Sequence, residues 1–206
     1  MVHYVKRETR NRFGQELEIN WERTSELEKE EKYVNFNRWC DREGIIRQNI
    51  RYPVAFGTKG ELIGLAATSE IGFSQAFLYV PSHLMINESR IRADPRIGHI
   101  IDKHPSLFAD KANSEHLVLV FYLLVEFGKG RDSFWFPYFE VVALPESLSL
   151  WDERDLDELH DPILKQESLD EMEDMINEFD EFLLVAQANS DCLNVAAFTF
   201  ENYVRA

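Results

Sequence analysis

The sequence predicts an α+β protein in which helices predominate. Two patterns support this class. Short runs rich in β-branched residues, broken by glycine and proline, fill 46–86, and stretches of helical spacing fill most of 87–206. A hydrophobic content of 45% and fifteen phenylalanines are typical of a globular chain with a sizeable core. We therefore expect three regions: a polar N-terminus with a short helix (1–45), a β-unit (46–86) and a helical region (87–206).

The N-terminal region contains one clear helix. Residues 1–30 are polar, with only scattered Trp21 and Leu27, and partial order at best is expected there. After them, apolar residues recur at three- and four-residue spacing, which predicts one buried face of a helix. Gly44 follows as its expected C-terminal cap. The residues on the predicted face are Tyr33, Phe36, Trp39 and Cys40.

The β-unit is predicted from short apolar runs and their breaks. Pro53, Gly57, Gly60 and Gly64 interrupt the runs, and "AFLYVP" reads as a last short strand that Pro81 ends.

The helical region begins after this proline. "SEHLVLVFYLLVEF" is apolar almost all round, as in a helix buried on several sides. Ser149 and Ser168, each with an acid three residues later, predict the starts of two acidic helices. Thr199 predicts the start of a last helix, with Phe198 and Tyr203 as its hydrophobic staple. Only seven residues follow Thr199, so we expect the helical region to be incomplete as given.

The charge distribution excludes some classes of partner. The net charge is −15, and the segment 152–181 carries fourteen acidic and two basic side chains, or −12. Binding to nucleic acid or to an anionic membrane surface requires a basic face, so neither is expected. A solvated helical face explains the acidic segment better than a docking surface for basic partners.

The remaining composition predicts no metal site and no catalytic triad. Cys40 and Cys192 have no neighbours at metal-ligand spacing, and no Ser-His-Asp, Cys-His or paired-carboxylate arrangement stands out. With no apolar signal segment, an intracellular protein, cytoplasmic or nuclear, is expected. Five of the histidines are dispersed without metal-ligand spacing: His83, His99, His104, His116 and His160.

The glycines of "GELIGLAATSEI" do not form a phosphate-binding loop. A Walker loop requires a lysine after its last glycine, whereas Leu65 follows Gly64. A dinucleotide fingerprint must open a helix, whereas this stretch continues as a strand. The pattern instead favours a glycine turn that allows a ligand to approach the backbone at a sheet edge.

Four further segments stand in a recognisable order around this turn. They are "FNRWCDREG", "AFLYVPSHLMIN", "SEHLVLVFYLLVEF" and "DSFWFPYFEVVALP", and "FTFENYVRA" ends the chain. Together they resemble the N-terminal half of SET-domain protein methyltransferases, in the branch of the Rubisco large-subunit and actin-histidine methyltransferases. The resemblance covers roughly 29–206. It implies a small SET-type β-unit followed by most of a helical insert, truncated before the catalytic half.

The resemblance also implies a reaction and a cofactor. It implies transfer of a methyl group from S-adenosylmethionine to a lysine or histidine nitrogen of a protein substrate. Glu61, Leu62 and Ile63 would contact the cofactor through backbone atoms beside Gly64, and Lys29 would contact its carboxylate. Leu62 departs from the family, because a glycine is usual there.

No catalytic residue is assigned. The Asn-His motif and the active-site tyrosine of the family have no counterpart in this sequence, so the transfer centre is expected to be incomplete in it. Two alternatives stay open: a non-catalytic SET-like module that binds partners through its acidic helices, or an inactive fragment.

Overall fold

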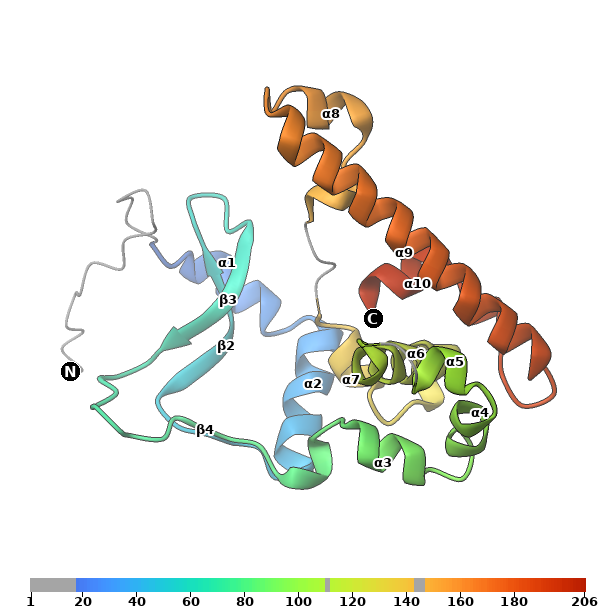
Figure 1. Cartoon of the computed structure of the whole chain (residues 1–206). Coiled ribbons are helices and arrows are strands. Elements are labelled where there is room, and N and C mark those ends of the chain that lie inside the picture. Colours follow the sequence, from blue (N-terminus) through green and yellow to red (C-terminus); the bar gives the residue numbers. More distant parts are fainter. Residues whose placement is uncertain (1–17, 110–111, 143–146) are drawn as a thin grey trace. The chain divides into compact units, whose positions relative to one another are not determined.

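The computed structural model describes residues 18–109, 112–142 and 147–206. The chain forms two compact units. The sheet unit comprises 18–85 and 137–141 of the described chain, and the helical unit comprises 86–136 and the described part of 142–206. Figure 1 labels most of the helices and strands of both.

The sheet unit begins with a helix where the sequence suggested partial order. Helix α1 spans Trp21–Leu27, and the Asn20 side chain caps it by accepting the Arg23 N–H at 2.9 Å. Leu27 is fully buried, and Thr24 Oγ1 accepts the Ala55 N–H at 3.0 Å. The expectation for 18–30 is therefore wrong. Packing against a strand orders a segment whose composition is polar, whereas 1–17 lie outside the described residues.

The second helix follows the sequence pattern closely. Helix α2 spans Glu31–Arg42, with Tyr33, Trp39 and Cys40 buried on one face. Gly44 comes just after the C-cap with a φ of +79°, the left-handed conformation that glycine adopts at little cost. The buried face is confirmed except at Phe36, which is only partly buried, and the glycine cap is confirmed.

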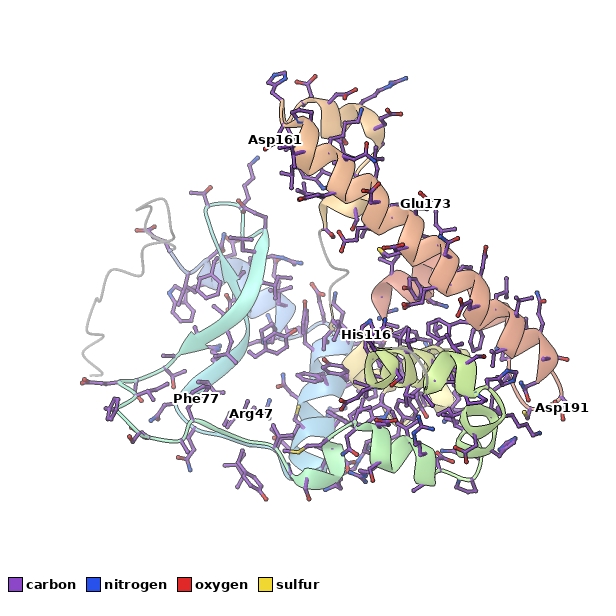
Figure 2. The ribbon with its side chains drawn as sticks, in the orientation of Figure 1. Arg47, Phe77, His116, Asp161, Glu173 and Asp191 are labelled. Atoms are coloured by element: carbon purple, nitrogen blue, oxygen red, sulfur yellow. The ribbon has the colours of Figure 1, made fainter. Side chains whose placement is uncertain are left out.

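Four short strands form two antiparallel pairs. They are β1 (Ile46–Arg47), β2 (Ile50–Phe56), β3 (Leu62–Ala67) and β4 (Leu78–Tyr79). Strand β2 pairs with β3 with Val54 opposite Gly64, and β1 pairs with β4. The β2–β3 ladder is irregular between Arg51 and Val54, where Pro53 has no N–H to donate. Figure 2 labels Arg47 of β1 and Phe77, whose carbonyl accepts the Gln48 N–H at 2.9 Å.

The core of the sheet unit is small and partly aromatic. Leu27, Tyr33 and Ala55 are buried together, and Tyr52 packs against them with its ring centroid 5.7 Å from that of Tyr33. Burial raises the pKa of the Tyr52 hydroxyl from 10.0 to about 12, and the nearby Tyr33 and Cys40 add to the shift. The neutral phenol is therefore the form that this core favours.

The shift at Tyr52 predicts a pH dependence of stability. A group whose pKa is raised on folding contributes stability below its unfolded pKa, and this contribution is lost as the pH rises through the folded value. The free energy of unfolding should therefore fall between about pH 10 and pH 12. Tyr52→Phe has no hydroxyl to ionise and should show a flatter decline in urea titrations. Tyr79→Phe, at an exposed position of β4, should keep the wild-type slope, and equal slopes in both variants would contradict the assignment.

The helical unit contains most of the helices. The central one is α6 (Ser114–Gly128), which buries side chains on several sides as its apolar sequence predicts. The other helices are α3 (Glu88–Ala93), α4 (Gly98–Lys103), α5 (Pro105–Phe108), α7 (Phe136–Phe139), α8 (Glu153–Asp157), α9 (Pro162–Ala188) and α10 (Phe200–Arg205). Of these, α7 begins in this unit and continues into the sheet unit. Short 3-10 turns cover Ser82–Leu84 in the sheet unit, and Gly130–Asp132, Leu148–Leu150 and Val195–Ala197 in the helical unit.

A cluster of phenylalanines forms the centre of the helical unit. The Phe121 ring of α6 lies 5.1 Å from Phe108, 5.9 Å from Phe182 and 5.7 Å from Phe198, measured between centroids. The first three of these side chains are fully buried. Aromatic packing of this kind stabilises the fold by more than the buried area alone would supply.

The two acidic helices form, but their predicted caps are wrong. Asp152 caps α8 and Asp161 caps α9, each accepting two backbone N–H groups at 2.9 to 3.0 Å. Ser168 instead lies inside α9 and donates to the Leu164 carbonyl at 2.8 Å. Asp161 is followed by Pro162, which suits a first helical position, so this pair starts the helix about two turns earlier.

The last helix begins as predicted. Thr199 Oγ1 accepts the Asn202 N–H at 3.2 Å, and Phe198 and Tyr203 are both buried. The Tyr203 hydroxyl donates to Glu178 of α9 at 2.8 Å, and burial followed by this carboxylate raises the pKa of Tyr203. The cap thus joins a helix that packs on the main core.

Candidate functional site

The glycine turn between β2 and β3 is built on left-handed glycines. Gly57 has a φ of +86° and Gly60 a φ of +67°, and the Gly60 N–H donates to the Gly57 carbonyl at 3.1 Å. A Cβ at Gly60 would lie 2.8 Å from Arg23 Cγ and 3.3 Å from Ala55 Cβ. Both the conformation and the close approach of α1 therefore require glycine here.

The predicted cofactor residues lie at the start of β3 and are accessible. Glu61, Leu62 and Ile63 are exposed, with Leu62 55% and Ile63 43% accessible, and Gly64 is half-buried. A Cβ at Gly64 would lie 3.3 Å from Phe56 Cε2, so the glycine leaves room for this ring. Among the described residues, β2 is the only strand that pairs with β3. The backbone of 61–64 therefore lies beside an open sheet edge.

Leucine at position 62, where the family usually has glycine, does not block this edge. Leu62 opens β3 opposite Phe56, in an extended conformation that any residue adopts, and its side chain is exposed. The backbone here is that of an ordinary strand.

Lys29 lies just past the end of α1, far from the glycine turn in the sequence. It occupies the bend between α1 and α2, its side chain is exposed, and its N–H donates to the Glu26 carbonyl at 2.9 Å. The contacts with the turn come from earlier residues. Asn20 Nδ2 donates to the Thr58 carbonyl at 3.2 Å, and the Arg23 stem packs against Gly60. A role of Lys29 at the cofactor stays a prediction.

Arg23 is a neighbour of the turn that sequence reasoning missed. Its guanidinium bonds Glu26 and Glu30, each at 3.0 Å, and the hydrogen bond with Glu26 is the main reason that the pKa of Arg23 is raised. The charge is thus permanent and already matched by two carboxylates. Asn20 before Trp21-Glu22 is an N-cap signal that could have revealed α1, and with it this contact.

The distinctive "SFWFPY" segment is held by polar contacts of α6. Ser133 Oγ donates to Glu126 Oε2 at 2.6 Å, and Trp135 Nε1 donates to the Tyr122 hydroxyl at 2.9 Å. Glu126 is almost completely buried and also bonds Lys129, and burial raises the pKa of Tyr122. These contacts give the segment a structural role. The segment also leads the chain out of the helical unit after Phe136 and into the sheet unit at 137–141.

Other kinds of site find no support in the described parts of the chain. No three His, Cys, Asp or Glu side chains gather there in a way that could hold a metal ion. None of the helices described is both long and apolar enough to cross a bilayer.

The paired short strands, the glycine turn and the following helical unit make up a mixed α+β fold in which helices predominate. Among solved structures, this fold resembles that of a SET-domain methyltransferase. The chain is similar to Rubisco LSMT, solved in a structure bound to AdoMet, with a TM-score of 0.59 and 24% identity. The match covers 84% of this chain and 38% of that one, so this chain spans well under half of its length. No family model and no curated protein matches the sequence.

Proposed function

We propose that this chain carries part of the cofactor site of an S-adenosylmethionine-dependent protein N-methyltransferase. The observation that carries the proposal is that residues 61–64 are accessible at an edge of β3 with which no other strand of the described chain pairs, in a fold similar to that of a protein solved with AdoMet bound. An intracellular location, cytoplasmic or nuclear, belongs to the same proposal.

The residues at this edge fit such a ligand. Backbone N–H and C=O groups of Glu61, Leu62 and Ile63 would orient it, and Gly64 keeps the strand free of a side chain on the Phe56 side. When bound, the cofactor supplies a methyl group on a sulfonium, and the acceptor is a neutral lysine or histidine nitrogen of a protein. The contribution of the chain is positioning, which can supply a large share of a rate enhancement. Lys29 is the proposed cation for the cofactor carboxylate.

Photo-crosslinking tests this proposal on the 206-residue chain, because it also captures weak binding. Ultraviolet irradiation with methyl-labelled S-adenosylmethionine should label the peptide that contains 61–64, and S-adenosylhomocysteine should compete. Gly64→Val, which adds a branched side chain against Phe56, should reduce the label at least tenfold. Gly72→Val is the matched control, because a Cβ there lies 3.6 Å from the nearest atom. An absence of competable label in this peptide would overturn the proposal.

A non-catalytic binding role is the alternative, and one observation favours it. Most acidic side chains of α8 and α9 are exposed. Figure 2 labels two exposed ones, Asp161, which caps α9, and Glu173 within it. Such a surface suits basic protein segments. Salt-sensitive binding of a lysine-rich peptide, together with no competable label at 61–64, would favour this alternative.

A further inference from the structure

One side chain links the first helix of the sheet unit to the glycine turn. Asn20 is half-buried, and its amide uses both polar atoms: Oδ1 accepts the Arg23 N–H at 2.9 Å, and Nδ2 donates to the Thr58 carbonyl at 3.2 Å. The first bond caps α1, and the second reaches across 38 residues of the chain to the turn that precedes 61–64. An amide carries an acceptor and a donor on separate atoms, whereas a carboxylate only accepts. Asparagine is therefore suited to hold both elements at once.

The backbone at Asn20 continues this link through β2. The Asn20 N–H donates to the Ala55 carbonyl at 2.9 Å, and the preceding residue, Ile19, forms an antiparallel bridge with Phe56. Phe56 also pairs with Leu62, the first residue of β3. The segment before α1 and the start of β3 thus lie on opposite edges of the same strand, so a displacement of one is passed to the other through β2.

Helix α1 also lies directly against the turn. Gly60 is buried, and a Cβ there would lie 2.8 Å from Arg23 Cγ, so no side chain separates the helix from the turn backbone. The helix itself has seven residues, too few to be stable without packing partners. The order of α1 and the position of the turn therefore depend on the contacts between them.

We propose that Asn20 is a positioning residue of the candidate cofactor site, because its Nδ2 holds the turn in the place that sets the start of β3. This inference deepens the proposed function and rests on it. Asn20 does not touch the cofactor in this proposal. It fixes the backbone groups of 61–64 before the ligand arrives, and such preorganisation increases affinity because less ordering is required on binding.

Asn20→Asp separates the two bonds, because a carboxylate still caps α1 but cannot donate to Thr58. In hydrogen-exchange mass spectrometry, the peptide 57–61 should exchange about fivefold faster than in the wild type, as expected for the loss of one hydrogen bond. The peptide of α1 should keep its wild-type rate, which shows that the helix is still folded. Unchanged exchange at 57–61 would overturn the positioning role.

Asn87→Asp is the matched control for this change. Asn87 caps α3 in the helical unit in the same way, by accepting the Arg90 N–H at 3.1 Å. The control introduces the same charge at a helix N-cap, and it should leave the exchange of 57–61 at the wild-type rate. Equal acceleration in both variants would show that added charge, and not the lost donor, loosens the turn, and would overturn the proposal.

Photo-crosslinking of the same variants tests the link to the cofactor. The label that methyl-labelled S-adenosylmethionine leaves at 61–64 should fall about fivefold in Asn20→Asp and stay unchanged in Asn87→Asp. A residue that only capped α1 would leave the label unchanged, because aspartate caps equally well. Wild-type label in Asn20→Asp would overturn the positioning role alone. A lack of competable label in every protein, the wild type included, would overturn the proposed function and this role with it.

Discussion

Gly98→Ala is expected to destabilise the helical unit by about 3 kcal/mol or more, at the upper end of the cost of overpacking. Gly98 is buried at the start of α4, and its N–H donates to the Asp94 carbonyl at 2.8 Å. A Cβ at this position would overlap the Arg92 carbonyl oxygen. Because this oxygen belongs to the main chain, relief requires α3 and α4 to separate. Urea unfolding followed by circular dichroism measures the loss.

Gly130→Ala is the matched control for this prediction. Gly130 lies in the same unit with a φ of +53°, and a Cβ there meets nothing within 4 Å. The control isolates the strain of the left-handed conformation, which costs roughly 1 to 2 kcal/mol. If Gly98→Ala were no more destabilised than Gly130→Ala, the close approach of 92 and 98 would be refuted.

Phe121→Ala is expected to cost about 3 to 5 kcal/mol, the range for truncating a buried aromatic side chain. The Phe121 ring contacts three other phenylalanine rings and is fully buried, so its removal leaves a cavity at the centre of the helical unit. Phe73→Ala makes the same chemical change at a fully exposed ring and should change stability by less than about 0.5 kcal/mol. Similar losses in both variants would show that Phe121 is not central. Because the chain has two units, near-ultraviolet and far-ultraviolet signals should be compared before a two-state fit is used.

Local patterns were enough to predict several elements. The buried face of α2, the apolar helix α6, the Thr199 cap and the glycine turn all depend on residues within a few positions of one another. Spacing and capping chemistry express such contacts directly in the sequence. The same holds for the α+β class, since the β-branched runs and the helical stretches occupy separate parts of the chain.

Other features depended on contacts between distant parts of the chain. The polar composition of 18–30 concealed α1, because Thr24 and Leu27 are ordered by β2, some thirty residues later. Two caps competed for the start of α9, and the Asp161-Pro162 pair prevailed over Ser168. The contact of Arg23 with Gly60 could not be predicted without α1 in place.

The sequence alone determined that a glycine turn, and not a phosphate loop, precedes an apolar strand in a chain that resembles the SET methyltransferases. Only the tertiary structure decided that 61–64 lie accessible beside an open edge, that α1 supports the turn through Asn20 and Arg23, and that Lys29 lies at the far end of that helix. The physical reason is the sequence separation over which each kind of interaction acts. Turn and helix propensities act over a few residues, whereas the exposure of a strand edge depends on which distant segments pack beside it.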